Sequence, residues 1–280
     1  MPLFNLLQTF TCKSTPLWQT IGLEQYSIIL KELRMPAQIE VPRWTAQEFE
    51  GLVLGSKPTV AVLDCDGTLW SGDAGHGFLV WSLEQGLVSR STSDWIDDRH
   101  RSYRAGKVSE VQICGEMVQI YAGLRDQELR AAAAQYVREF VQPRVFTEMK
   151  SLVAALRRAG AEIWAVSSTN HWVVAEGVRE FEIPEDHVLA ARVRVNAGAI
   201  CSDLVDVPTD EGKVASLVRI GLPHPDAVFG NSIHDLAMLK IARSAFPVNP
   251  SRALLEAAAR NGWGYFLPQG ADGLQAAVLG

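Results

Sequence analysis

The sequence contains few cysteines and no long apolar run. Its four cysteines are far apart and form no CxxC pair, so the sequence predicts neither a zinc site nor a disulfide framework. No apolar stretch reaches the roughly 18 to 20 residues that a membrane span requires. Residues 1–18 also lack the basic start and the continuous apolar segment of a secretory signal. We therefore expect a cytoplasmic protein with reduced thiols and no contact with a membrane.

Basic residues are also in short supply. Asp and Glu total 32 against 26 Lys and Arg, which gives a formal net charge of −6 at pH 7, and no Lys/Arg-rich run interrupts this balance. Such a balance argues against nucleic acid as a partner. With 280 residues, of which 48% are hydrophobic, the chain is long enough to bury a large core. The composition is that of an ordinary soluble globular protein.

One stretch, Val60–Trp70, organises the predicted fold. An apolar run that ends in two carboxylates one residue apart, followed by Gly-Thr, is typical of a buried strand, which we expect over 58–64. Because side chains alternate along a strand, Asp64 and Asp66 are expected to face one site while Cys65 points away. Open α/β sheets bind their ligands at this edge. Two carboxylates at one site repel each other, so we expect a bound cation, a bound proton or a role in a reaction there.

Residues 73–142 predict several helices where a simple doubly wound fold has one short crossover. A capping box at 109–112 begins one helix, and a second helix is expected over 126–141. An insertion of this length predicts a helical cap over the ends of the strands. Trp70 and Trp81 flank the exit from the first strand, so we expect them in the core, in the cap or in the lining of a substrate pocket.

Strands and helices alternate again after this cap. A small β-hairpin is expected around Asn196–Gly198, beside the sheet. Thr209 is expected to cap the helix that carries Lys213, and Asn249 to cap the helix that follows the last strand. This alternation predicts an α/β fold with a doubly wound, mainly parallel, Rossmann-like sheet. The expected strands after the cap are 162–166, 227–229 and 245–248.

The expected organisation of the chain has three parts. Thr45 and Glu48 form a capping box for a helix through Leu54 in the first part, which we expect to be peripheral. The sequence leaves a monomer and a homodimer equally open. The three parts are an N-terminal extension over 1–57, a core over 58–72 and 143–280, and the helical cap over 73–142.

Polar residues follow the predicted strands at four places. Because a parallel sheet brings the carboxyl ends of its strands to one edge, we expect these residues to meet there, although roughly 170 residues separate the first from the last. In this order the four motifs resemble the haloacid dehalogenase-like hydrolase superfamily over about residues 58–265. They are the DxDGT box at 64–68, Ser167 at the end of a strand, Lys213, and the Gly-Asn-Ser-x-x-Asp box at 230–235.

The resemblance implies a phosphatase that forms a covalent phosphoenzyme. Phosphoryl transfer needs an in-line nucleophile, neutralisation of charge and a proton donor for the leaving group. Asp64 is placed to attack phosphorus and form an aspartyl-phosphate, and Asp66 to protonate the departing alkoxide and later to deprotonate water. The expected phosphate-binding residues are Thr68, Ser167, Ser168 and Lys213, of which the lysine also supplies charge to the nucleophile.

Mg²⁺ is the expected cofactor because it prefers oxygen ligands from carboxylates and phosphate. Its expected ligands are Asp64, Asp66, Asn231 and Asp235. Proteins of the superfamily usually carry Asp at the position of Asn231. An amide oxygen still binds Mg²⁺ but brings no charge, so we expect activity with a higher Mg²⁺ requirement. The alternative is a degenerate member that binds a ligand without turnover.

The position of the cap resembles the branch of the superfamily that includes phosphoserine phosphatase. In that branch an acidic residue shortly after the first motif binds the amine of the substrate, and Asp73 falls there. A cap arginine binds the carboxylate, for which Arg99, Arg101 and Arg104 are equal candidates. The Ser-Ser-Thr-Asn edge at 167–170 lacks the usual Gly pair, which argues against phosphoserine itself. A small phosphorylated metabolite is the expected partner, and phosphotransfer to another acceptor, as in a mutase, is the alternative reaction.

Overall fold

The computed structural model of the protein describes residues 41–271. The expectations for residues 1–40 lie outside this described part. By its internal contacts the described part belongs to one compact unit, so the cap and the core can be considered together. No helix within residues 41–271 is both long enough and apolar enough to cross a membrane.

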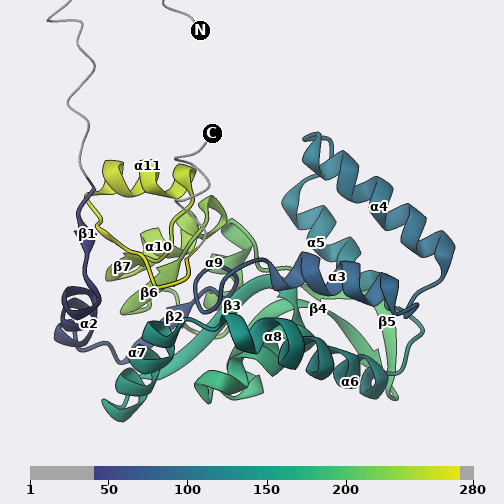
Figure 1. Ribbon diagram of the computed structural model, residues 1–280, viewed down its shortest axis with the longest axis horizontal. Coiled ribbons are helices and arrows are strands. Elements are labelled where there is room, and N and C mark those ends of the chain that lie inside the picture. The colour runs from purple at the N-terminus through teal and green to yellow at the C-terminus, as the bar shows by residue number, and fades with distance from the viewer. Residues whose placement is uncertain (1–40, 272–280) are drawn as a thin grey trace, which may run out of the picture. The chain divides into compact units, whose positions relative to one another are not determined.

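A six-stranded sheet forms the centre of the fold (Figure 1). Its strands are β2 (Val60–Leu63), β3 (Glu162–Asn170), β4 (Val188–Asn196), β5 (Ala199–Asp206), β6 (Ala227–Gly230) and β7 (Ser244–Pro247). They lie in the order β5-β4-β3-β2-β6-β7, and neighbours run parallel except for β4 and β5, which are antiparallel. A separate two-stranded sheet pairs β1 (Arg43–Trp44) with β8 (Tyr265–Phe266) in parallel.

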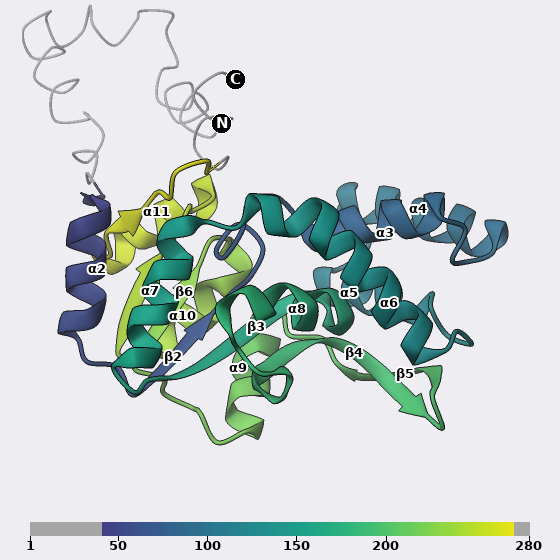
Figure 2. The same ribbon diagram turned by 60° about the horizontal axis from the view of Figure 1, so that its bottom comes forward.

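Helices cover both faces of the central sheet (Figure 2). They are α2 (Ala46–Gly55), α7 (Thr147–Arg158), α8 (His171–Gly177), α9 (Glu211–Arg219), α10 (Leu236–Ile241) and α11 (Arg252–Asn261). In β2, Ala61 and Leu63 pack with α2, α7 and α8, whereas Val62 packs on the other face with α9, α10 and α11. All three side chains are fully buried, because adjacent strand residues point to opposite faces and both faces are covered. The predicted α/β class with a mainly parallel sheet is confirmed.

A group of helices inserted between β2 and β3 forms the cap. These helices are α3 (Ala74–Glu84), α4 (Arg90–Arg104), α5 (Glu110–Gln119) and α6 (Asp126–Tyr136), which continues as a π-helical turn over Val137–Val141. Backbone hydrogen bonds tie the cap to the β4–β5 hairpin, since Gly123 donates to Ile200 at 2.8 Å and Ile200 donates to Leu124 at 2.9 Å. Figures 1 and 2 both show α3, α4 and α5 grouped together near this hairpin.

The β-hairpin is part of the central sheet, whereas the sequence predicts it beside the sheet. β4 begins at Val188 and pairs in parallel with β3 before it turns back into β5. The same pairing extends β3 to Asn170, although its predicted end is Val166. Polar side chains do not end a strand when a neighbouring strand still supplies partners for the backbone.

Two helix starts differ from those predicted. Asp210 instead of Thr209 is the N-cap of α9, and Ser251 instead of Asn249 is the N-cap of α11. Asp210 and Asn249 have φ angles of 50° and 45°, so the chain turns sharply before each helix begins. Asn249 donates from Nδ2 to the carbonyl of Gly67 at 3.2 Å, which joins this turn to the first motif.

Residues 43–57 pack against the core, although the sequence predicts them as part of a peripheral extension. The capping box of Thr45 and Glu48 begins α2 as expected. Phe49 is 2% exposed and stacks on Phe266 with ring centroids 4.4 Å apart. Burial of an aromatic pair of this size contributes to the stability of the core. The core therefore begins before β2.

Candidate active site

The end of β2 places Asp64 in a buried position. Its side chain is 8% exposed, and its backbone N–H donates to the carbonyl of Phe229 at 3.0 Å. The carboxylate accepts hydrogen bonds from Nζ of Lys213 at 2.7 Å and from Oγ1 of Thr68 at 2.9 Å. Burial, followed by repulsion from Asp235, raises the pKa of Asp64 to about 7, while Lys213 opposes this shift. The predicted nucleophile is therefore held in one orientation from both of its oxygens.

Lys213 lies on α9 and joins two acidic residues across the site. Its side chain is 2% exposed. Nζ donates to Oδ1 of Asp64, to Oδ1 of Asp235 at 2.6 Å and to the carbonyl of Val166 at 3.1 Å. Burial alone would lower the pKa of Lys213, but the two carboxylates outweigh burial and raise it. The lysine is a fixed cation between the first and the last motif.

The loop after β6 places Asn231 against the first motif. A Cβ atom on Gly67 would lie 1.9 Å from Nδ2 of Asn231, and Gly67 has a φ of 71°, so glycine is favoured at this close approach. Asp235 holds the loop, because its Oδ2 accepts the backbone N–H groups of Asn231 and Ser232, both at 2.9 Å. The two carboxylate oxygens of Asp235 are thus divided between this loop and the lysine.

Three donors hold the carboxylate of Asp66. Nε1 of Trp70 and the N–H of Ala74 each lie 2.7 Å from Oδ1, and Oγ1 of Thr169 lies 2.6 Å from Oδ2. Burial, followed by the charge of Asp73, raises the pKa of Asp66 to about 6, while the three hydrogen bonds oppose this shift. A carboxyl group that titrates in this range can both donate and accept a proton near neutral pH.

The oxygen atoms around Asp64 are of the kind that Mg²⁺ prefers. Residues 41–271 contain no group of three or more His, Cys, Asp or Glu side chains that could hold a metal ion. Asn231 replaces one carboxylate of the predicted set, and the carboxylates of Asp66 and Asp235 already accept several hydrogen bonds. These donors fit an ion that takes some ligands from phosphate and water, as Mg²⁺ commonly does.

The predicted phosphate-binding residues lie in two groups. Thr68 and Lys213 bond directly to the carboxylate of Asp64. Ser167 is 1% exposed on β3, and its Oγ accepts the backbone N–H of residue 169 at 3.1 Å. Ser168 instead lines a cavity on the cap side of the strand. The structure therefore places Thr68 and Lys213 at the predicted nucleophile and Ser168 on the side of the cap.

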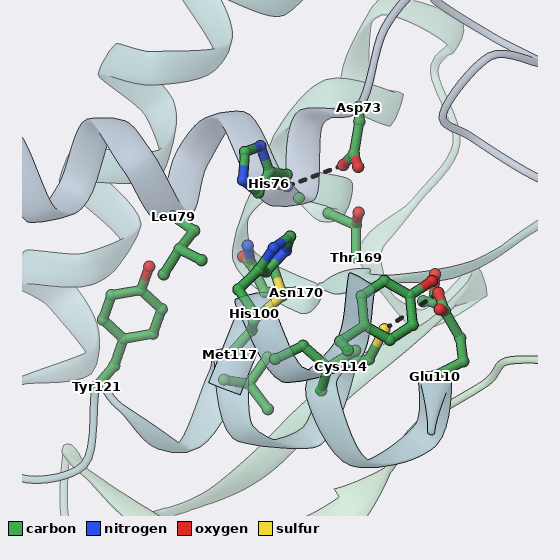
Figure 3. Close-up of a pocket in the computed structure, with 15 residues that line it drawn as sticks. Asp73, His76, Leu79, His100, Glu110, Cys114, Met117, Tyr121, Thr169 and Asn170 are labelled. Carbon is green, nitrogen blue, oxygen red and sulfur yellow. Dashed lines mark hydrogen bonds between the residues drawn. The ribbon is translucent and has the colours of Figure 1, made fainter. Parts of the chain in front are cut away.

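A cavity of about 110 Å³ lies between the cap and the end of β3 (Figure 3). It is lined by residues of α3, α4 and α5 and by residues 168–170 of β3. Asp73, the N-cap of α3, lies in its wall and accepts the backbone N–H of His76 at 2.8 Å. Figure 3 shows these two residues across the cavity from Glu110 on α5. Thr169 connects the cavity with the predicted general acid, to whose carboxylate it donates.

Two of the three predicted cap arginines pair with acidic residues that do not line this cavity. Arg101 pairs with Asp98 and its side chain is 62% exposed. Arg99 forms two hydrogen bonds to Glu116, at 2.7 and 2.6 Å. Among the described residues, the lining of the cavity includes none of the three candidates, Arg104 being the third. Contact between a cap arginine and the substrate stays a prediction without support from the cavity.

Several contacts around the site are not predicted from the sequence, although Trp70 itself is expected in the core, in the cap or in the lining of a pocket. Trp70 is fully buried, and it bonds to the carboxylate of the predicted acid. Thr169 bonds to the same group; its position two residues beyond the predicted phosphate-binding serine is a signal that could have identified it. His100 and Glu110 line the cavity from cap helices, where spacing alone does not reveal which face meets the core.

Fold and site together place carboxylates and a buried lysine at the carboxyl edge of a mainly parallel sheet. The model of the family described as haloacid dehalogenase-like hydrolase matches residues 61–240. The chain therefore belongs to this family, as the motifs predict. The match covers β2, the cap, β3 and the segments that carry Lys213 and Asp235.

Curated relatives are similar over most of their length. A histidinol-phosphatase of Neisseria meningitidis serogroup C is 21% identical over 215 residues, which cover 73% of this chain and 96% of the relative. A probable phosphatase of Mycobacterium tuberculosis is 25% identical over 237 residues, which cover 81% of this chain and 80% of the relative. The family and these relatives support phosphoester hydrolysis as the general reaction.

Solved structures share the fold. A protein of unknown function from Bordetella pertussis Tohama I has a TM-score of 0.66 at 23% identity, over 74% of this chain and 97% of that chain. A probable phosphoserine phosphatase from Vibrio cholerae has a TM-score of 0.58 at 15% identity, over 91% of this chain and 72% of that chain. At these identities the likeness concerns the fold alone.

Proposed function

We propose that the protein is a Mg²⁺-dependent phosphatase that hydrolyses a small-molecule phosphomonoester through an aspartyl-phosphate. The observation that carries this proposal is the buried Lys213, whose Nζ lies 2.7 Å from Asp64 and 2.6 Å from Asp235. Asp66 follows two residues after Asp64 and is held by its own donors. A nucleophile, a cation and a proton carrier at one edge supply the parts that phosphoryl transfer needs.

In the first step a carboxylate oxygen of Asp64 attacks phosphorus in line with the leaving oxygen. The ester bond to phosphorus breaks as the new bond forms, and Asp66 gives its proton to the departing alkoxide. Thr68 and Lys213 hold the attacking carboxylate through their hydrogen bonds. The charge of the lysine also offsets that of the incoming phosphate. A pKa of about 6 for Asp66 supports a protonated fraction near neutral pH.

In the second step water attacks the phosphorus of the aspartyl-phosphate. Asp66 accepts a proton from this water, the bond between phosphorus and the oxygen of Asp64 breaks, and inorganic phosphate leaves. Asp64 is thereby restored as a carboxylate. Trp70 and Thr169 hold the acid/base group in both steps through the hydrogen bonds described above.

Mg²⁺ is the proposed cofactor, with Asp64, Asp66, Asn231 and Asp235 as the residues that would hold it. When bound, the ion supplies positive charge to the phosphate oxygens. The amide of Asn231 brings no charge, so a weaker site is expected than one with a further carboxylate. A small phosphorylated metabolite is the proposed substrate, and the names of the relatives bring histidinol phosphate and phosphoserine into the panel to be tested.

A screen for phosphate release from phosphomonoesters at saturating Mg²⁺ tests this function. We expect release from at least one ester, and loss of turnover by about 1,000-fold or more in Asp64→Asn. Labelled phosphate should remain on the acid-quenched wild-type protein and be missing from that variant. Asp98→Asn makes the same change in an exposed carboxylate of α4 and should leave turnover intact.

Product analysis separates the alternatives. Transfer of the label to a second acceptor, without free phosphate, would establish a phosphotransferase or mutase. If neither the label nor free phosphate appeared with any ester, the protein would be a binding member of the family, and Asn231 would be the first residue to examine.

A further inference from the structure

The cavity lies on the side of the site where the alcohol of a substrate would leave. Its wall includes Thr169, whose Oγ1 lies 2.6 Å from the carboxylate of Asp66. Ala74, which follows the wall residue Asp73, donates its N–H to the same carboxylate at 2.7 Å. A group that receives its proton from Asp66 is therefore within reach of the cavity. The chemistry of the wall indicates what that group carries.

The charged residues of the wall are acidic. Asp73 and Glu110 line the cavity, and no lysine or arginine is found among its lining residues in the described part of the chain. The nearby Arg99 and Arg101 are engaged with Glu116 and Asp98 outside it. A third arginine, Arg104, acts on the lining residue His100 by its charge but is not itself in the lining. A substrate carboxylate placed here would therefore meet Asp73 and Glu110 without a cation among the described wall residues to pair with it.

Glu110 has a carboxylate oxygen that awaits a donor. Its Oε1 accepts the S–H of Cys114 at 3.6 Å, but Oε2 is buried and has no hydrogen-bond partner within residues 41–271. The nearest basic atom, Nε2 of His234, is 4.0 Å away. Burial, followed by the hydrogen bond of Tyr103 to Glu110 and then by the charge of Glu110, raises the pKa of Tyr103. Tyr103 therefore also bonds to Glu110, and Oε2 is the atom of this carboxylate that stays without a partner among the described residues. A buried unpaired acceptor is costly, and an ammonium group would satisfy it.

Two histidines form the side of the cavity next to Asp73. The rings of His76 and His100 have centroids 4.6 Å apart, and Nδ1 of His100 is buried without a hydrogen-bond partner in the described part of the chain. Burial, followed by the charges of His76 and Arg104, lowers the pKa of His100. A neutral imidazole offers an acceptor to an N–H group, so His100 is suited to a cationic ligand.

The size of the cavity restricts the ligand further. Its volume of about 110 Å³ is smaller than the roughly 150 Å³ of an apolar cavity that holds benzene. The rest of the lining includes the largely apolar side chains of Leu79, Ile113, Met117, Val118 and Tyr121. A short aminoalkyl chain or a single small ring has the right size and carries both apolar and charged atoms.

We propose that this cavity selects phosphate esters of small alcohols that carry a positive charge and no carboxylate, with Glu110 as the residue that recognises the charge. The proposal rests on the phosphatase function proposed above and extends it to the class of substrate. Asp73 would share the recognition of the cation from the opposite wall.

Matched esters test the proposal. We expect kcat/KM for O-phosphoethanolamine or histidinol phosphate to exceed that for glycerol phosphate about tenfold or more, because one charge-assisted hydrogen bond is at stake. O-phosphoserine, which adds a carboxylate to the same amine, should be a poorer substrate than O-phosphoethanolamine. Equal or better turnover of the neutral ester or of phosphoserine would contradict the proposal and leave the phosphatase function intact.

Variants assign the preference to named residues. Glu110→Gln should reduce the ratio of kcat/KM between the cationic and the neutral ester about tenfold. Asp73→Asn should reduce it as well, and it keeps the start of α3 because Asn caps a helix as well as Asp. The ratio is insensitive to partial unfolding, since both esters report on the same folded fraction. Glu84→Gln, in an exposed residue of α3, is the matched control and should leave the ratio unchanged.

A binding measurement separates this proposal from the proposed function. Calorimetric titration of the Asp64→Asn protein should show tighter binding of O-phosphoethanolamine than of glycerol phosphate, whether or not the wild type turns over either ester. Loss of that difference in the double variant with Glu110→Gln is the expected result. Equal affinities in the Asp64→Asn protein, or a preference that persists without Glu110, would overturn the assignment.

Discussion

The core end and the cap end of the site differ in how their buried polar groups are partnered. At the core end, the carboxylates of Asp64 and Asp235 share the Nζ of Lys213, and each accepts a further hydrogen bond. At the cap end, Oε2 of Glu110 and Nδ1 of His100 are buried without hydrogen-bond partners in the described residues. At the core end, the charged groups are already held in place before a substrate binds. At the cap end, these buried polar atoms lack hydrogen-bond partners in residues 41–271, and a ligand could provide them. The predictions below test this division.

Removal of the central cation should have the largest effect. Lys213→Met leaves two buried carboxylates without the cation that lies between them, so we expect the free energy of unfolding to fall by about 3–5 kcal/mol and turnover to be lost. Urea unfolding at constant pH measures the first effect. Lys240→Met removes a lysine from the exposed side of α10 and should change stability by less than about 0.5 kcal/mol. Equal losses in the two variants would mean that the lysine does not hold the core end together.

Weakening the support of Asp66 should have a smaller effect on catalysis. Thr169→Val removes one of the three donors to the acid/base carboxylate, and we expect kcat to fall about tenfold while KM changes less. Thr59→Val is the matched control, because Thr59 also donates to a carboxylate but at the opposite edge of the sheet. Steady-state kinetics on both variants distinguish the two positions. A change in KM alone would place Thr169 in substrate binding instead.

The amide in the last motif should set the metal requirement. Asn231→Asp restores a charged oxygen beside the first motif, so we expect the Mg²⁺ concentration for half-maximal turnover to fall about tenfold. Titration of activity with Mg²⁺ measures this concentration in both proteins. Asn261→Asp, on α11, provides a control with the same change of charge away from the site. An unchanged Mg²⁺ dependence in Asn231→Asp would show that this position does not limit metal binding.

The sequence predicted the core end of the site better than the cap end. Asp64 and Asn231 each follow a strand and Ser167 lies near the end of one, and parallel pairing brings the ends of such strands to one edge whatever the length of chain between them. The order of the motifs along the sequence therefore predicts that their side chains lie near one another. The turn before α11 shows the limit of this reasoning, because the left-handed conformation of Asn249 and its bond to Gly67 depend on contacts across the fold.

At the cap end, charge type alone points to the arginine candidates, because the sequence does not show how a helix is oriented. Arg99 and Arg101 lie on α4, yet one faces Glu116 of α5 and the other is mostly exposed to solvent. Which face of a cap helix meets the cavity depends on packing between helices distant in sequence, and helical spacing does not encode it. Glu110 begins α5 directly after a capping serine, so its position suggested only a favourable charge at a helix start.

The last test uses Asp226, a carboxylate at the amino edge of the same sheet. Its hydrogen bonds are already formed, so we expect its substitution to change stability and not activity. Asp226 accepts the hydroxyl of Thr59 at 2.6 Å and the backbone N–H groups of Thr59 and Val60 at 2.9 and 3.1 Å. These bonds, with the hydroxyl first, lower the pKa of Asp226 below its ordinary value of 3.8. Because this pKa is lower in the folded than in the unfolded chain, the stabilisation is present above 3.8 and is lost as the pH falls through the folded value.

Asp226→Asn should therefore lower the free energy of unfolding by about 1 kcal/mol at pH 7, since the side chain keeps an acceptor but loses its charge. The difference from wild type should shrink as the pH falls from 3.8 towards the lower folded pKa of Asp226, because the unfolded chain binds this proton first and the folded protein binds it only at lower pH. Urea unfolding between pH 7 and pH 3 measures this trend, and kcat/KM should be unaffected. A loss of activity with unchanged stability would contradict the division of roles, because it would make a carboxylate at the amino edge part of the catalytic machinery.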